Sequence, residues 1–194
     1  VYGEDIHNVR IVEETPICLT SYYGLVKYTA EWLYAKTIGS QKESSLVVLR
    51  PPLIYGPEDL GKTYGPSGFV WAALNNKPIT LWGDGTELRE FIFVEDIVRA
   101  VCGLLDSDFS GVVNVASGKS YAFRDVLKIV SDLVGHALDI KSFARTKDKV
   151  DNAFDNTHFT RFMPAFRFTS LQEGIRKTFE AEAKLLGQAM QGVK

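Results

Sequence analysis

The sequence predicts an α/β fold built on parallel strands, and two neighbouring segments carry this prediction. A helix is predicted from Thr20 or Ser21 to about Ile38, where Gly39 stops it. The run 46–49 that follows is continuously apolar, which is typical of a parallel strand covered on both faces. A strand that follows a helix in this way implies an α/β crossover. Composition agrees, because 194 residues with 45% hydrophobic content suffice for one sizeable core, or for a partial domain plus a small one.

The remaining elements follow from local patterning. Residues 4–19 are polar and turn-rich and predict a loop. The helix after them has apolar positions on more than one face, so we expect it to be deeply buried or to pack on a partner. Beyond Pro57 the pattern indicates a smaller, mixed region that starts with a mobile Gly/Pro-rich loop over 58–66. Further helices are predicted at 67–76, 95–105, 122–134 and 170–190, and further strands at 78–82, 91–94, 112–115 and 138–143.

Charge and residue spacing exclude several classes of function. The formal net charge is −2 and the lysines are scattered, so the sequence offers no basic patch for nucleic acid. It has no apolar run of about 18 residues, so no membrane span is predicted. The histidines and the two cysteines, Cys18 and Cys102, lack metal-ligand spacing. We therefore predict no metal site and expect free thiols in a reducing cytoplasm.

One pair of side chains indicates chemistry. Tyr23 and Lys27 lie four residues apart in the first predicted helix, and side chains at this spacing share a helix face. A nearby cation lowers the pKa of a phenol, which would let Tyr23 serve as an acid and base near neutral pH. On its own the spacing favours the alternative, a half-buried tyrosine with a lysine stem alongside. The neighbouring Tyr22 is predicted to be a packing residue.

Later motifs decide between these alternatives. The Tyr23–Lys27 run is followed by Pro51-Pro52-Leu53-Ile54-Tyr55-Gly56-Pro57, by a segment from Gly83 to Asp96 and by Gly111-Val112-Val113-Asn114-Val115-Ala116-Ser117-Gly118. In this order and spacing they resemble the C-terminal two-thirds of an extended short-chain dehydrogenase/reductase of the NAD-dependent epimerase/dehydratase family, which acts on nucleotide sugars. The resemblance covers nearly the whole chain. Its most specific part, from Gly83 to Asp96, is similar to the family signature G-x-G-x-x-x-R-[DE]-[FY]-x-x-V-x-D.

The resemblance implies a role for each residue of the cofactor end. Tyr23 would be the catalytic acid/base, and Lys27 would lower its pKa while binding the nicotinamide ribose. Tyr23, Lys27 and Pro51 would contact the cofactor, NAD or NADP. The chemistry supports this assignment, because hydride transfer at a sugar carbon requires a proton to move on the adjacent hydroxyl. Gly24 has no side chain and would let a bulky cofactor approach.

The resemblance assigns Arg89, Arg145 and Leu53 to the substrate. A guanidinium such as that of Arg89 suits a nucleotide diphosphate, because its fork makes bidentate contacts to phosphate oxygens. The alternative for Arg89 is a surface ion pair with Glu87 or Glu90. Asp84, between two glycines, is predicted to form a turn.

Two substrate positions depart from the family pattern. Arg145 opens a stretch similar to the family's R-x-G-D-x(n)-A-D, and the resemblance makes it a second phosphate-contacting arginine, although Lys147 stands where glycine is usual. Leu53 stands where the family commonly has an asparagine that touches the substrate diphosphate. That contact is lost in this sequence.

The resemblance also exposes an absence, since no G-x-G-x-x-G or G-x-x-G-x-x-G run occurs. We expect a fragment of a longer enzyme, inactive alone, whose catalytic Ser or Thr precedes Val1. Residues 1–57 would complete an NAD(P)-binding Rossmann domain with an incomplete parallel sheet. Residues 58–194 would form mainly a smaller, mixed α/β sugar-nucleotide-binding domain, with some segments returning to the Rossmann domain. The first helix would contribute to a homodimer.

Three hypotheses for the function remain open. The first is an NAD(P)-dependent epimerase, dehydratase or reductase of a nucleotide sugar. The second is a reductase of a steroid-like or flavonoid-like ketone, because the Pro51-Pro52 pair resembles a variant found in such enzymes. Arg89 favours the nucleotide-sugar hypothesis over this one. A non-catalytic binding module is the third. The sequence leaves open the sugar, the nucleobase, the reaction type and the choice between NAD and NADP.

Overall fold

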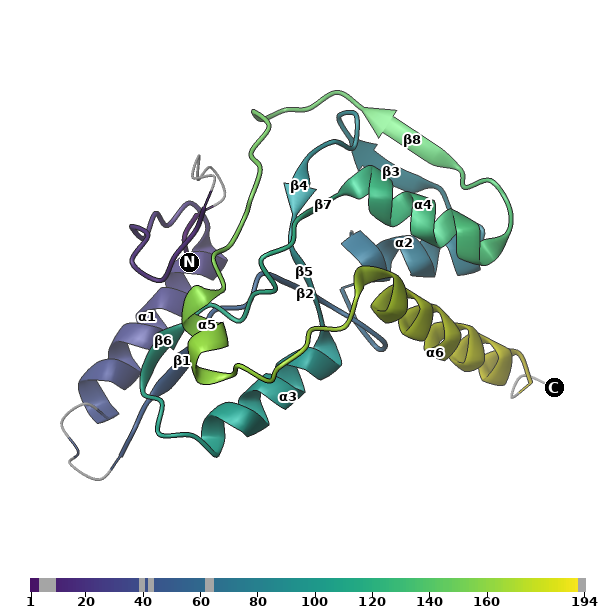
Figure 1. The fold of residues 1–194 in the computed structure, drawn as a ribbon. Coiled ribbons are helices and arrows are strands. Elements are labelled where there is room, and N and C mark those ends of the chain that lie inside the picture. Colours follow the sequence, from purple (N-terminus) through teal and green to yellow (C-terminus); the bar gives the residue numbers. More distant parts are fainter. Residues whose placement is uncertain (4–9, 39–40, 42–43, 62–64, 192–194) are drawn as a thin grey trace.

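The structure, a computed structural model, describes residues 1–3, 10–38, 41, 44–61 and 65–191 (Figure 1). Helices and strands alternate along much of the chain, as an α/β fold requires. The loop predicted over 58–66 lies partly outside the described residues. In chain order the elements are α1 (Tyr22–Ile38), β1 (Val47–Leu49), β2 (Leu53–Tyr55), α2 (Gly65–Leu74), β3 (Ile79–Trp82), β4 (Leu88–Arg89), β5 (Phe91–Phe93), α3 (Val94–Leu105), β6 (Gly111–Val113), β7 (Tyr121–Ala122), α4 (Phe123–Val134), β8 (Ile140–Phe143), α5 (Thr157–Phe162) and α6 (Leu171–Gln191).

Parallel pairing of the strands confirms the predicted fold class. Strand β1 pairs with β6, β2 with β5, and β3 with β8, all in parallel. The short strands β4 and β7 pair antiparallel. Parallel partners need a crossover between them, and helix α3, which begins directly after β5, leads the chain back to β6 beside β1. The register sets Leu53 opposite Phe91 and Tyr55 opposite Phe93.

The described residues pack around two hydrophobic cores. The first lies under helices α2, α4 and α6, and its members include Phe69, Phe93, Val126 and Ile175. The second lies among α3, α5, β6 and the loops beside them, with β1 packed against it, and is formed by Ala100, Leu104, Phe109, Val113, Val115 and Phe159. Figure 1 shows the two groups of elements side by side. The chain after residue 57 thus contributes to both cores, and the domain division at that residue stays a prediction.

The predicted elements differ from the observed ones where segments are short. Strand β2 was not predicted, because three residues directly after two prolines show no period. Helix α5 was also missed, since its six residues make fewer than two turns. The prediction that the first strand is covered on both faces is wrong for the described residues. Strand β1 is half-buried throughout, and β6 is its only ladder partner in the part of the chain that the structure describes.

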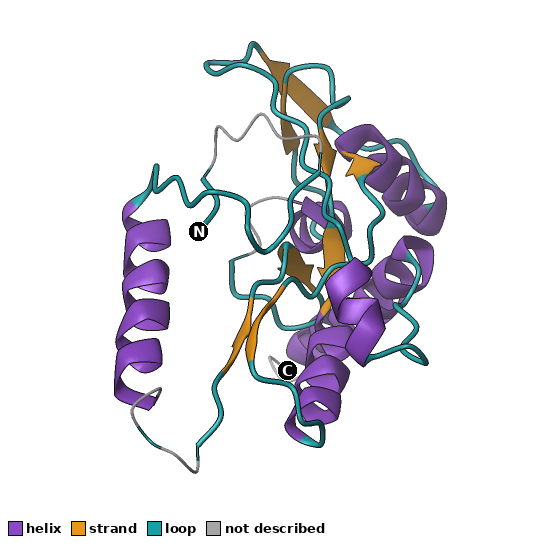
Figure 2. Ribbon diagram, turned by 60° about the vertical axis from the view of Figure 1, so that its left-hand side comes forward, coloured by secondary structure: helices purple, strands orange, loops and turns teal. Residues whose placement is uncertain are grey.

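Helix α1 is not deeply buried, which corrects one of the two expectations for it. Gly24 is the only buried residue of this helix, and large apolar side chains such as Trp32 lie more than half exposed. Figure 2 shows α1 standing at one side of the molecule, away from the other helices. Packing on a partner, including the homodimer, stays a prediction. Among the described residues no helix is long and apolar enough to cross a membrane.

Candidate active site

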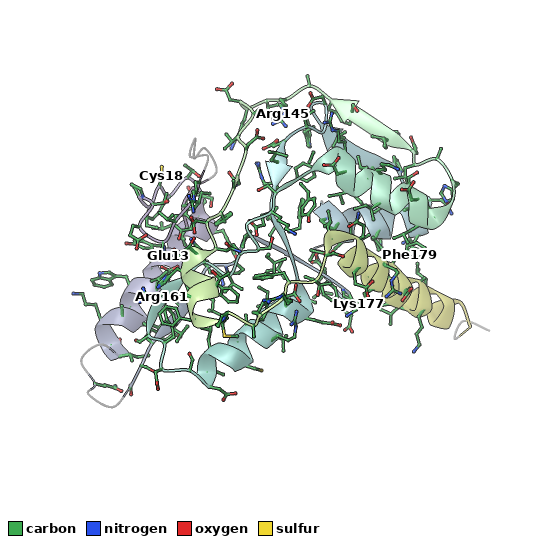
Figure 3. The ribbon with its side chains drawn as sticks, viewed as in Figure 1. Glu13, Cys18, Arg145, Arg161, Lys177 and Phe179 are labelled. Atoms are coloured by element: carbon green, nitrogen blue, oxygen red, sulfur yellow. The ribbon has the colours of Figure 1, made fainter. Side chains whose placement is uncertain are left out.

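A cleft of about 620 Å³ separates the N-terminal segment and α1 from the loops around β3 and β8. Of the predicted site residues, it is lined by Tyr23, Pro51, Leu53, Arg89 and Arg145. Lys27 is absent from the lining and stands one helical turn after Tyr23. In Figure 3, Arg145 lies on the connection after β8, and Cys18 lies across from it beside α1; both residues line the cleft. The fold therefore brings together residues that lie far apart in the sequence.

Tyr23 lies in the first turn of α1. The hydroxyl oxygen of Ser21 accepts a hydrogen bond of 3.1 Å from the backbone N–H of Gly24, so Ser21 caps the helix, as predicted. Tyr23 is 73% exposed, which leaves its phenol open to a ligand in the cleft. The Nζ of Lys27 stands 5.4 Å from the centroid of the Tyr23 ring. The predicted shared helix face is thus confirmed, in a cation–π arrangement.

A buried ion pair fixes α1 against the floor of the cleft. Arg50, directly after β1, donates from Nη2 to Glu31 of α1 at 2.7 Å and from Nε to both oxygens of that carboxylate at 3.2 Å. Its Nη1 donates to the Tyr2 hydroxyl at 3.0 Å, and that hydroxyl donates to Asn114 Oδ1 at 2.7 Å. Pro51 and Pro52 of the cleft follow Arg50 directly. The ion pair therefore sets the position of Tyr23 relative to these prolines.

Glu87 holds the two predicted phosphate-binding arginines together. One of its carboxylate oxygens contacts Nη2 of Arg89 and the other contacts Nη2 of Arg145. Arg89 also donates from Nη1 to the backbone carbonyls of Leu88, at 2.9 Å, and Val150. All three charged side chains are largely buried and line the cleft. The ion pair with Glu87 that was the alternative for Arg89 is thus present, and it lies in the cleft.

The turn between β3 and β4 shapes this cluster. Asp84 accepts hydrogen bonds from the backbone N–H of Thr86 at 3.0 Å and from the Thr86 hydroxyl at 2.7 Å, which confirms it as a turn former. Gly83 has a φ of +77°, and a Cβ on it would overlap the Nε of Arg145. The absence of a side chain at Gly83 therefore lets Arg145 cross the turn and reach Glu87.

Sequence reasoning missed two further residues of the cleft. Glu90 is almost fully buried, and its Oε1 accepts backbone hydrogen bonds from Ser117 and, at 3.0 Å, from Gly118. Burial raises the pKa of Glu90, and these hydrogen bonds oppose the rise. Trp82 is 55% exposed and packs on Phe143 at a ring distance of 5.4 Å. Both residues lie in or beside the Gly83 to Asp96 segment, and the family signature in that segment is the sequence feature that could have identified them.

The side chains at one end of the cleft fit the nicotinamide half of a dinucleotide. Tyr23 and the bare Cα of Gly24 lie in the lining, and Lys27, which is outside it, places its Nζ on the same helix face as the Tyr23 ring. A parallel α/β fold that joins such a Tyr-Lys helix to a pair of arginines is the arrangement that the motifs implied for the short-chain dehydrogenase/reductase class. The sequence has no glycine-rich pyrophosphate turn, so the fit covers that half alone.

Comparison with known proteins gives the family. The model of the NAD dependent epimerase/dehydratase family matches residues 1–116, which is more than half of the chain. The chain therefore belongs to this family, as the motifs predicted. The family is NAD-dependent, and several of the similar solved structures contain NAD.

Solved structures and a curated relative agree with this membership. A UDP-N-acetylglucosamine 4-epimerase from Methanobrevibacter ruminantium M1, in complex with UDP-N-acetylmuramic acid, is 28% identical, with a TM-score of 0.83 over 97% of this chain and 60% of that one. The UDP-glucose 4-epimerase of Thermus thermophilus in complex with NAD is 27% identical, with a TM-score of 0.73 over 93% of this chain and 60% of that one. An uncharacterized UDP-glucose epimerase, YtcB, from Bacillus subtilis (strain 168) is 26% identical over 188 residues, 90% of this chain. The chain spans 55% of the length of that relative.

Proposed function

We propose that the full-length protein is an NAD-dependent epimerase or dehydratase of a nucleotide sugar, with its chemical step at Tyr23. The observation that carries the proposal is the convergence of Tyr23, Arg89 and Arg145 on one cleft. A phenol at one end and guanidinium groups at the other match a ligand with a reactive hydroxyl and a diphosphate. Relatives named as UDP-sugar epimerases support the same class of substrate.

Each residue of the cleft has a task in this proposal. The Tyr23 hydroxyl takes the proton from a sugar hydroxyl and returns it, and Lys27 stands beside the Tyr23 ring on the same helix face. When bound, NAD would supply the acceptor and donor of the hydride. Arg89 and Arg145 bind the diphosphate, which holds the sugar carbon at the Tyr23 end of the cleft. Pro51 and Leu53 give this cleft an uncharged floor.

The test is turnover of a UDP-sugar by the full-length protein with Tyr23→Phe. This substitution removes only the transferable proton, so the rate should fall by about 100-fold or more while NAD binding is kept. Tyr22→Phe is the matched control, because Tyr22 is the adjacent phenol on the same helix, is 88% exposed and does not line the cleft. This control should turn over at the wild-type rate.

Two outcomes would overturn the proposal. If Tyr23→Phe retained turnover within a few-fold of the wild type, the chemical step would lie elsewhere. If the wild type converted no UDP-, dTDP-, GDP- or CDP-sugar but reduced a steroid-like or flavonoid-like ketone, the second hypothesis would replace the first. Absence of both activities would favour the binding module.

A further inference from the structure

The cluster of Glu87, Arg89 and Arg145 has a feature that the proposed function does not require. A diphosphate site needs positive charge, yet its two guanidinium groups already share one internal carboxylate. Each oxygen of that carboxylate contacts a different arginine through the Nη2 atom. A ligand phosphate group, which also presents two oxygens, would bind between the same two atoms. The Glu87 carboxylate therefore occupies the position that such a phosphate group would take.

We propose that Glu87 is an internal competitor at the diphosphate site, which a ligand phosphate displaces on binding and which returns to the arginines on release. The proposal rests on the proposed function, because it assigns Arg89 and Arg145 to the ligand diphosphate. It makes Glu87 a determinant of ligand affinity, in addition to the residues that bind the ligand.

Arg89 and Arg145 each have an anchor other than Glu87. Glu87 is therefore a competitor for the arginines and is not needed to hold them in place. Arg89 is held from its other side, because Nη1 donates to the carbonyls of Leu88 and Val150. The side chain of Arg145 lies across Gly83, and its Cγ, Cδ and Nε fill the space that a Cβ on this glycine would occupy. Neither anchor involves the Nη2 atoms that face Glu87. Both guanidinium groups would therefore keep aiming Nη2 at the cleft when the carboxylate leaves.

The backbone around Glu87 is held by contacts that do not involve the Glu87 side chain. Glu87 lies at the end of the turn between β3 and β4, and the turn itself is held by hydrogen bonds from Thr86 to Asp84. Its neighbour Leu88 is fixed separately, since the Leu88 backbone N–H donates to Asp151 at 2.9 Å. The Glu87 side chain borders the cleft, so a change of rotamer leaves no hole in either core. A displaced carboxylate would remain near the ligand and repel it, which lowers affinity.

The test measures binding of inorganic pyrophosphate and of UDP to the full-length protein by calorimetric titration at low salt. Glu87→Gln keeps the shape of the side chain and removes its charge, so both ligands should bind about tenfold more tightly than to the wild type. Glu95→Gln is the matched control, because Glu95 pairs with Lys177 outside the cleft, and its affinities should equal those of the wild type.

Several results would overturn the inference. Equal or weaker binding by Glu87→Gln would make Glu87 a brace for the arginines. Glu87→Ala serves as a second neutral variant, and failure of both variants to fold would likewise assign Glu87 to the scaffold. Absence of pyrophosphate binding in the wild type and in both variants would show that no anion site exists. Pyrophosphate carries neither sugar nor nucleobase, so tighter binding without sugar turnover would refute the proposed function and leave this inference standing.

Discussion

Removal of the Arg50 guanidinium should weaken the whole N-terminal part of the molecule. Arg50 and Glu31 are 9% and 16% exposed, so their ion pair is screened little by solvent. Arg50→Met keeps an apolar stem in the same place but leaves the Glu31 carboxylate without its cation. Breaking one side of a buried pair costs about 3–5 kcal/mol, and the residual exposure of Glu31 places the expected loss near 3 kcal/mol.

The loss can be assigned to the pair by a double-mutant cycle. In Glu31→Leu/Arg50→Met no charge is stranded, so the double variant should recover about 1.5 kcal/mol relative to the sum of the single variants. The free energy of unfolding is measured by urea denaturation of the full-length protein, followed by circular dichroism. Arg176→Met is the control, because Arg176 pairs with Glu173 and Glu180 on an exposed helix face. The urea midpoint of Arg176→Met should equal that of the wild type.

The reasoning fails if the Arg50→Met loss is below about 1 kcal/mol, or if the two single losses simply add in the double variant. Either result would mean that the Glu31 carboxylate becomes hydrated when the Arg50 guanidinium is removed. Helix α1 would then be positioned by something other than this pair, and the position of Tyr23 would need another explanation.

Two further predictions concern the cleft. Gly83→Ala should weaken UDP binding by about tenfold or more. The new methyl group would displace Arg145, which would then lose its proposed charge-assisted contact with the diphosphate of UDP. Gly135→Ala is the matched control, because Gly135 has a similar φ of +72° but open space around it. This variant should lose about 1 kcal/mol of stability and bind UDP with the wild-type affinity. Equal UDP affinities for the two variants would contradict the steric argument. Burial raises the folded-state pKa of Glu90, so the stability that its protonation gives is present below the unfolded pKa and is lost as the pH rises through the folded pKa. The thermal midpoint of Glu90→Gln relative to the wild type should therefore rise as the pH is raised above the ordinary pKa of a glutamate, and a difference that is constant or falls would contradict the assignment.

The sequence alone predicted the features that depend on residues close together in the chain. The Ser21 cap, the Asp84 turn and the shared face of Tyr23 and Lys27 each involve a separation of four residues or fewer, so the local backbone conformation decides them. The parallel α/β class was also predicted, because a continuous apolar strand after a helix has few other solutions. The motifs from Gly83 to Asp96 indicated the family.

Only the tertiary structure decided which charges meet. Arg50 is joined to Glu31, and Arg145 to Glu87, by contacts that no periodic pattern in the sequence records. It also decided that Glu90 is buried and that α1 presents an apolar surface, since burial depends on which other segments pack nearby. Residue type and helix or strand period fix the direction in which a side chain leaves its own element. The partner at the other end depends on loop closure between distant segments, and that is a property of the folded chain alone.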